Sequence, residues 1–194
     1  MIIYLHGFNS TDTAQKAQRL KQLLAPEIVL SPTYPPNPEE AIKYLEEFTR
    51  QAQISRNTPG GTLMFIGTSL GGFYAQYLGR LFKAKVVMIN PALDPMTVLK
   101  PYIGENINFN TGEKYNFTQQ YLYAFKPLYI DDPAKDIIPT LVLLDEGDKS
   151  IDYRTAAERY KNYAIVVTYK GGNHRFAHLN EAVEIIKNFY YNIY

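Results

Sequence analysis

A serine lies between glycines in the stretch GTSLG, which follows a short apolar run and precedes an apolar segment of helical length. The G-x-S-x-G spacing between a strand and a helix is typical of a nucleophile elbow, where a strained backbone projects the serine hydroxyl away from a sheet. Gly67 and Gly71 would leave room for the sharp turn. The Leu70 amide, at a helix N-terminus, would point toward a bound carbonyl oxygen. We interpret Ser69 as a nucleophile; the alternative is a glycine-rich connection with an incidental serine.

A serine hydroxyl needs a base, and the chain holds three histidines. His174 lies in GGNHRF, between the last predicted strand and the last predicted helix, which places it at the same sheet edge as Ser69. His6 follows the first predicted strand, where a structural role in shaping the loop is the simpler interpretation. His178 falls in the last predicted helix, four residues after His174, but the H-E-x-x-H pattern of a zinc site is absent. His174 is therefore the predicted base, and we expect neither a metal nor a cofactor.

Several acidic residues follow predicted strands and could hold the histidine in its reactive orientation. Asp148 is the preferred acid, because it lies in the loop between the strand PTLVLLD and the next helix. Asp145 is expected to end that strand, and Asp152 to cap the following helix. Glu146 is a further alternative. Asp94 is the main competitor, since an acid after the preceding strand could also reach the histidine.

The stretch HGFNS follows the first predicted strand. A loop in that position can supply a second hydrogen-bond donor to an oxyanion. Gly7 would let the backbone approach the carbonyl, and the Phe8 amide is the predicted donor, with Asn9 as the alternative. Together with Leu70, Phe8 would complete an oxyanion hole.

These residues need a scaffold, and the chain alternates short apolar runs with amphipathic segments. The predicted strands are 1–5, 27–30, 62–66, 85–90, 139–145 and 164–169. The predicted helices are 12–25, 38–56, 70–82, a segment near 153–161, and 177–193, with Asp12 as the N-cap of the first. Strands that are apolar on both faces and separated by helices indicate an α/β fold, with a mostly parallel sheet of about six strands covered by helices on both faces.

Residues 94–136 are too long for a simple connection in such a fold. They hold many aromatic side chains: Tyr102, Phe109, Tyr115, Phe117, Tyr121, Tyr123, Phe125 and Tyr129. One interpretation is an extra helical layer that only completes the core. The preferred one is a small cap that helps form a pocket at the carboxyl ends of the strands, where open α/β sheets bind ligands. We expect residues 1–194 to form a single domain that includes this insertion.

The composition limits the partners. A formal net charge of +1 gives no bulk attraction to nucleic acid or to an anionic membrane. The chain has 0 cysteines, which excludes disulfides and thiolate chemistry and fits a cytoplasmic protein. No apolar stretch approaches the ~18 residues of a membrane span. A small molecule is therefore the expected partner, and the oligomeric state stays open.

The four motifs LHGF, GTSLGG, GD and GGNH together resemble the α/β-hydrolase superfamily. More narrowly, the whole chain resembles the small bacterial YqiA-like serine esterases, which also carry an NPA segment, here 90–92, and a TGE-Tyr insertion, here 111–115. The resemblance implies an α/β-hydrolase fold and a serine esterase with Ser69, Asp148 and His174 as its catalytic triad, in the chain order expected of that fold.

The resemblance leaves the substrate class open. It implies hydrolysis of a carboxylic ester through an acyl-enzyme, with an acyl-CoA thioesterase using the same triad as the alternative. A non-catalytic binding protein on the same fold is a third hypothesis, although such proteins usually lose triad members. One departure is Lys149 beside the acid: pointing inward it would weaken the hold on the histidine, whereas pointing to solvent it would change little.

Overall fold

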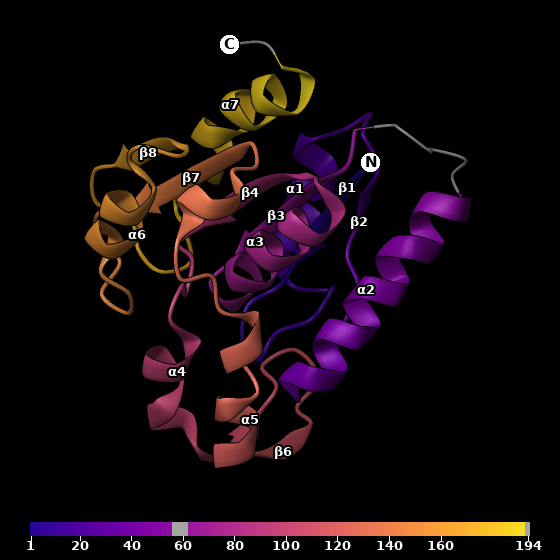
Figure 1. The fold of residues 1–194 in the computed structure, drawn as a ribbon, viewed down its shortest axis with the longest axis vertical. Coiled ribbons are helices and arrows are strands. Elements are labelled where there is room, and N and C mark those ends of the chain that lie inside the picture. Colours follow the sequence, from indigo (N-terminus) through magenta and orange to yellow (C-terminus); the bar gives the residue numbers. More distant parts are fainter. Residues whose placement is uncertain (56–61, 193–194) are drawn as a thin grey trace.

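A six-stranded sheet forms the centre of the protein (Figure 1). The computed structural model describes residues 1–55 and 62–192. The strands are β1 (Ile2–Leu5), β2 (Val29–Leu30), β3 (Met64–Thr68), β4 (Lys85–Ile89), β7 (Thr140–Asp145) and β8 (Ile165–Tyr169). Their order is β2-β1-β3-β4-β7-β8, and every neighbouring pair is parallel. The predicted parallel sheet is confirmed.

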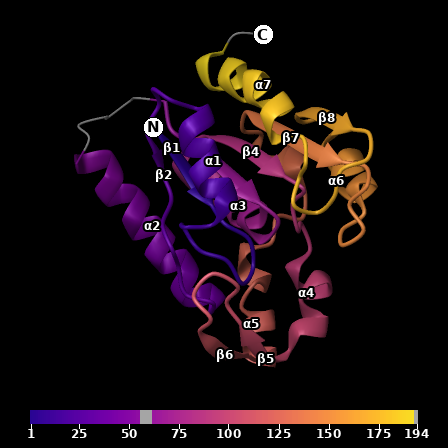
Figure 2. The same cartoon turned by 180° about the vertical axis from the view of Figure 1, so that it is seen from behind.

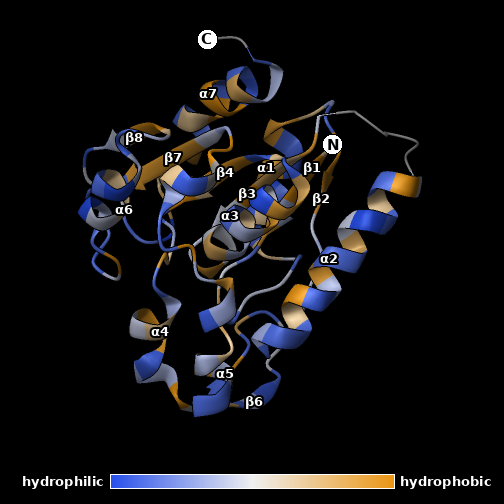
Figure 3. Ribbon diagram, in the orientation of Figure 1, coloured by the Kyte–Doolittle hydropathy of each residue, from blue (hydrophilic) through white to orange (hydrophobic). Residues whose placement is uncertain are grey.

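Helices cover both faces of this sheet, as Figures 1 and 2 show from opposite sides. They are α1 (Gln15–Leu23), α2 (Pro38–Ser55), α3 (Leu70–Phe82), α6 (Tyr153–Tyr160) and α7 (Leu179–Tyr191). Side chains alternate along each strand, so Ile2 and Tyr4 pack in one core with α1 and α7, while Ile3 and Leu5 pack in the other with α2, α3 and α6. The strands of this sheet are accordingly largely hydrophobic in Figure 3.

Local boundaries differ from the sequence prediction in two informative places. Strand β3 runs to Thr68, so the sheet ends directly at Ser69. The prediction that Asp12 caps the first helix is wrong, because α1 begins after Ala14. The Asp12 carboxylate instead accepts a hydrogen bond from the Thr33 hydroxyl at 2.6 Å, a partner far away in sequence. Residues 56 and 193, at the ends of two predicted helices, lie outside the described residues.

The insertion, residues 94–136, is built from short and irregular elements. Its elements are α4 (Pro95–Val98), η1 (Lys100–Tyr102), β5 (Gly104–Ile107), β6 (Lys114–Phe117), α5 (Gln119–Tyr123), η2 (Lys126–Leu128) and η3 (Pro133–Asp136). The antiparallel pair β5–β6 forms a hairpin that the sequence prediction did not include.

The aromatic side chains of the insertion range from fully buried to exposed. Phe117 and Phe125 are fully buried and join the core cluster that contains α2 and α3. Phe109 and Tyr123 are 80% and 63% exposed. The insertion therefore completes the core on its inner side and presents aromatic surface on its outer side. No helix in the described ranges is long and apolar enough to cross a membrane.

Candidate active site

Ser69 occupies the sharp turn between β3 and α3. Its φ of 53° and ψ of −120° lie in a region that residues with a side chain rarely adopt. The turn is held by the Ser69 amide, which donates to the Ile89 carbonyl at 3.0 Å. A Cβ atom on Gly67 would lie 2.0 Å from the Gly71 carbonyl oxygen, and one on Gly71 would lie 2.1 Å from the Leu5 carbonyl oxygen. Only glycine fits at these two positions, so the local sequence permits the strained serine.

The structure brings Ser69, His174 and Asp148 together in one hydrogen-bonded chain. His174 Nε2 lies 3.0 Å from Ser69 Oγ, and His174 Nδ1 lies 2.7 Å from Asp148 Oδ2. When the imidazole is neutral and its Nδ1–H donates to the carboxylate, Nε2 keeps a lone pair that can accept the serine proton. The His174 side chain is 32% exposed, whereas that of Asp148 is 1% exposed. This arrangement can activate a hydroxyl nucleophile at a site open to solvent.

Asp148 is fixed by its own loop. Its Oδ1 atom accepts hydrogen bonds from the amides of Ser150 at 2.8 Å and Ile151 at 3.0 Å, which leaves Oδ2 for His174. Lys149 is exposed, so the charge beside the acid faces solvent. The carboxylate therefore reaches the histidine in a fixed orientation.

The competing acids have other partners. Asp94 accepts the Thr97 amide at 3.1 Å and caps α4. Asp152 accepts the Arg154 amide at 3.0 Å and caps α6, as predicted. Glu146 is exposed. Within the described residues, none of these three carboxylates is hydrogen-bonded to a histidine.

Asp145 forms a second aspartate–histidine pair that the sequence interpretation missed. His178 is the residue before the first turn of α7 rather than part of the helix, and its Nδ1 atom lies 2.6 Å from Asp145 Oδ1. This hydrogen bond raises the pKa of His178. The other carboxylate oxygen of Asp145 accepts the amides of Asn173 at 3.0 Å and Ala177 at 2.7 Å. The sequence did contain a signal for this second pair. Asp145 and Asp148 lie three residues apart, and His174 and His178 lie four residues apart.

Asn90 holds the same loop from the neighbouring strand. Its side-chain amide donates to the carbonyl oxygens of Asn173 at 3.0 Å and His174 at 3.3 Å. Its Oδ1 atom accepts the Asp145 amide at 2.9 Å. The backbone on both sides of His174 is thus fixed by Asn90 and Asp145, whose side chains lie at the carboxyl ends of adjacent strands.

The amides of Leu70 and Phe8 are the two predicted oxyanion donors, and both belong to backbone next to Ser69. Leu70 is the first residue of α3, a position whose amide has no partner within a helix. A Cβ atom on Gly7 would lie 3.9 Å from Ser69 Oγ, so the backbone that leads to Phe8 passes directly beside the hydroxyl. In the described part of the chain, neither the Phe8 amide nor the Leu70 amide donates a hydrogen bond to another residue. Among the described residues, both amides thus lack a hydrogen-bond acceptor.

His6 lies beneath this loop. Its ring stacks on Tyr34, with 4.0 Å between the ring centres and 7° between the planes, and the Tyr34 hydroxyl donates to the His6 carbonyl. His6 Nδ1 lies 2.9 Å from the Gly7 carbonyl oxygen. Burial lowers the pKa of His6 to about 4, so the ring is neutral at pH 7 and shapes the loop, as expected.

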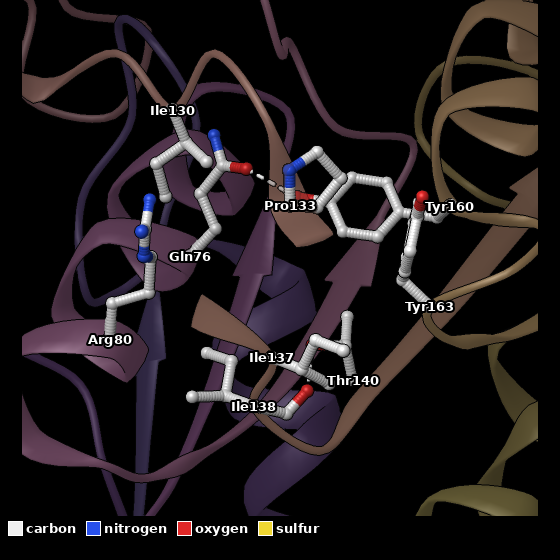
Figure 4. Close-up of a pocket in the computed structure, with 9 residues that line it drawn as sticks. All are labelled: Gln76, Arg80, Ile130, Pro133, Ile137, Ile138, Thr140, Tyr160 and Tyr163. Atoms are coloured by element: carbon white, nitrogen blue, oxygen red, sulfur yellow. Dashed lines mark hydrogen bonds between the residues drawn. The ribbon is translucent and has the colours of Figure 1, made fainter. Parts of the chain in front are cut away.

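The structure also contains a cavity and a groove. Figure 4 shows the cavity, of about 20 Å³, between α3, β7 and α6, where the Tyr160 hydroxyl donates to Gln76. Thr140, which lines it, begins β7, so the cavity lies at the sheet edge opposite Ser69, and its volume suits a single water molecule. A groove of about 470 Å³ lies between α4 and α5. Among the described residues, no cluster of three or more histidine and acidic side chains could hold a metal ion.

Residues 1–191 match the sequence profile of a family described as "Uncharacterised protein family (UPF0227)". The chain belongs to the UPF0227 family. A UPF0227 protein of Yersinia enterocolitica is 28% identical over 191 residues, which cover 97% of this chain and 98% of that protein. UPF0227 protein YcfP of an Escherichia coli strain is 24% identical over 191 residues, which cover 97% of this chain and 98% of YcfP.

Solved structures show the fold of this UPF0227 chain. Est1E from Butyrivibrio proteoclasticus, bound to ferulic acid, aligns with a TM-score of 0.76 at 17% identity, over 98% of this chain and 88% of Est1E. Alpha/beta hydrolase domain-containing protein 10 from mouse aligns with a TM-score of 0.76 at 14% identity, over 100% of this chain and 90% of the mouse protein. The predicted α/β-hydrolase fold is confirmed.

Proposed function

We propose that this protein is a serine hydrolase that cleaves carboxylic esters through an acyl-enzyme. The observation that carries the proposal is the continuous hydrogen-bonded chain from Ser69 Oγ through His174 to Asp148, which begins at a strained elbow. A serine with an adjacent neutral imidazole, itself oriented by a carboxylate, is the arrangement that activates a hydroxyl nucleophile.

In the proposed reaction, His174 Nε2 takes the Ser69 proton while Oγ attacks the carbonyl carbon. The amides of Phe8 and Leu70 would hold the resulting oxyanion, and Asp148 would stabilise the imidazolium. The ester C–O bond then breaks, and the leaving alcohol takes the proton from His174. A water molecule repeats the sequence on the acyl-enzyme, releasing the acid and restoring the serine.

The names of the structural neighbours guide the choice of first substrate. Est1E is described with ferulic acid bound, and other neighbours are described as an esterase from Pyrobaculum calidifontis and a monoacylglycerol lipase from Paleococcus ferrophilus. These names come from proteins that share only the fold with this chain. Carboxylic esters are therefore the first class to test, with p-nitrophenyl acetate and butyrate as probes and acyl-CoA thioesters as the comparison.

Nucleophile activation can be tested without knowing the natural substrate. A fluorophosphonate probe should label the folded wild-type protein at Ser69, as mapped by peptide mass spectrometry. Ser69→Ala should not be labelled and should lose on the order of 10⁶ in p-nitrophenyl ester turnover. Ser55→Ala, at an exposed position near the end of α2, is the matched control and should behave as wild type. Wild-type turnover by Ser69→Ala, with unchanged folding, would exclude Ser69 as the nucleophile.

The pH dependence tests the base separately. His174 must be neutral to accept the serine proton, so the rate should fall as the solution is acidified and the imidazole becomes protonated. A rate that does not fall on acidification while the protein stays folded would contradict the role of His174.

A further inference from the structure

The hairpin β5–β6 of the insertion is attached to the loop that follows β1. In Figures 1 and 2 the indigo segment after β1 descends to this hairpin. The attachment involves residues 8–10, which begin with the predicted oxyanion donor Phe8. It joins parts of the chain about a hundred residues apart in sequence, so it exists only in the folded protein.

Asn9 is the centre of the attachment. Its φ of 57° is a left-handed conformation, which asparagine tolerates better than most residues. Its side-chain amide donates to Asn106 Oδ1 at 3.2 Å, and its Oδ1 atom accepts the Tyr115 hydroxyl. Its backbone carbonyl accepts the Phe109 amide at 2.9 Å. Asn9 is only 8% exposed, so these bonds are formed largely out of water and fix both its side chain and its backbone.

Phe8 is held by packing against the same insertion. Its ring makes edge-on contacts with Tyr102, Tyr115 and Phe117, at 5.5, 6.4 and 5.3 Å between ring centres. On the other side of Asn9, the Ser10 carbonyl accepts the Asn108 side-chain amide at 3.1 Å. The three residues 8–10 therefore all contact the insertion, Phe8 by its ring, Asn9 by its side chain and backbone, and Ser10 by its backbone carbonyl.

Tyr115 is suited to be a lasting donor in this contact. A tyrosine hydroxyl is protonated at neutral pH, and burial raises the pKa of the Tyr115 hydroxyl further. Asn106, the second partner of Asn9, is itself fixed by donating to the carbonyls of Tyr102 at 2.6 Å and Gly104 at 3.1 Å. The hairpin thus presents one donor and one acceptor in fixed positions, and these match the two ends of the Asn9 amide.

We propose that Asn9 and Tyr115 are positioning residues for the oxyanion hole, and that the hairpin β5–β6 is a fixed support for the Phe8 amide. The inference rests on the proposed esterase function. The Phe8 amide must lie within hydrogen-bond distance of the developing oxyanion, and the loop that carries it has no regular secondary structure of its own. The hairpin supplies the rigidity that the loop lacks.

Tyr115→Phe tests the proposal, because it removes the hydroxyl and keeps the ring that packs on Phe8. Complete loss of one oxyanion donor costs ~10²–10³ in kcat, so a displaced donor should cost about 10-fold or more. KM for p-nitrophenyl butyrate should change little, because the interaction forms mainly in the transition state. Tyr44→Phe, on the exposed side of α2, is the matched control and should keep wild-type kcat.

A thionoester of the same acyl group separates positioning from general damage. Sulfur is larger than oxygen and accepts hydrogen bonds poorly, so a thionoester draws little benefit from the hole. Tyr115→Phe should therefore slow the oxygen ester much more than the thionoester, and the ratio of the two kcat/KM values should fall about 10-fold. A loss of folded protein would slow both substrates equally and leave the ratio unchanged.

Asn9→Gly provides a second variant, because glycine accepts the left-handed backbone without strain while removing both side-chain hydrogen bonds. If Asn9 and Tyr115 act through one contact, the double variant should lose no more activity than Asn9→Gly alone. An unchanged ester-to-thionoester ratio in both single variants would overturn the positioning role while leaving the esterase function intact. A wild-type protein that neither reacts with the fluorophosphonate nor cleaves either ester would overturn the proposed function, and the inference with it.

Discussion

Two aspartate–histidine pairs lie close together at the carboxyl edge of the sheet, and they differ in what surrounds them. The N–O distances are nearly equal, 2.7 Å in Asp148–His174 and 2.6 Å in Asp145–His178. His174 offers its second nitrogen to Ser69, whereas the His178 ring stacks on Tyr169. The same chemical pair therefore faces a serine hydroxyl in one case and an aromatic ring in the other.

The partners of the carboxylates explain this difference. Asp148 uses one oxygen to hold its own loop and the other to hold the imidazole that faces Ser69. Asp145 has a fully buried side chain and binds two backbone amides of the loop that carries His174, as well as His178. The first pair places an imidazole within hydrogen-bond distance of Ser69, and the second fixes the backbone from which that imidazole projects.

Asp148→Asn should have the largest effect on kcat and should distinguish the two aspartate–histidine pairs most clearly. An asparagine can keep the bonds to the Ser150 and Ile151 amides, but it favours the wrong histidine tautomer, and such a change lowers kcat by about 10⁴ in a serine triad. Stability should change little. The measurement is kcat with p-nitrophenyl acetate beside a thermal melt, with Asp152→Asn as the control because asparagine is also a good N-cap. Activity near that of wild type would remove Asp148 from the triad.

Asp145→Asn should have the opposite effect, lowering stability more than kcat. It places an amide group where a buried carboxylate accepts two backbone amides and pairs with His178, so its NH2 group would face either a backbone N–H or His178 Nδ1, which can accept it only after a change of tautomer. Such a loss should cost about 2–4 kcal/mol of unfolding free energy, with kcat reduced far less than by Asp148→Asn. Urea denaturation and steady-state kinetics on the same sample check both parts. Glu146→Gln, at the exposed neighbouring position, serves as the control, and equal stability of the two variants would contradict the structural role of Asp145.

The pH dependence of stability tests whether His178 is paired with Asp145 in the folded protein. Its hydrogen bond to Asp145 raises its pKa, so the folded state binds this proton more tightly than the unfolded state does. The stabilisation is therefore complete below the unfolded pKa of ~6.5 and is lost as the pH rises through the higher folded value. Between pH ~6 and pH ~9, the urea midpoint of the wild type should fall more than that of His178→Asn. Parallel curves for the two proteins would contradict the pairing.

The smallest effect should come from Lys149→Ala. The lysine is exposed beside a buried acid, so solvent screens its charge, and kcat should stay within about 2-fold of wild type. Lys43→Ala, on the exposed side of α2, is the control. A larger change that disappears at high salt would show that the Lys149 charge acts on the triad after all.

The sequence predicted the scaffold well because its signals are local. Short apolar runs alternating with amphipathic segments identified the six strands and the helices between them, and the confirmed sheet follows from that alternation. The positions of Ser69, Asp148 and His174 followed from the same reasoning, since loops after parallel strands meet at one edge. Asp12 failed as a cap because its partner, Thr33, belongs to a loop that no local pattern connects to it.

The insertion was the least predictable part, for a related physical reason. Its aromatic content indicated packing but not the partner, and the hairpin β5–β6 forms against residues 8–10, far away in the chain. The pairing of Asp145 with His178 is likewise a contact between distant segments, the end of β7 and the N-cap of α7. Both depend on which surfaces meet when the helices pack on the sheet, and a single sequence does not contain that information in any one window.

By itself the sequence determined the α/β alternation, the glycines that permit the Ser69 turn, and the edge at which the chemical groups meet. Those features depend on backbone sterics and on the period of hydrophobic residues, which act over a few positions. Only the tertiary structure decided which of two acids faces which of two histidines, and which part of the insertion contacts Phe8. These choices depend on distances and hydrogen bonds between segments far apart in the chain, and they are made when the core closes.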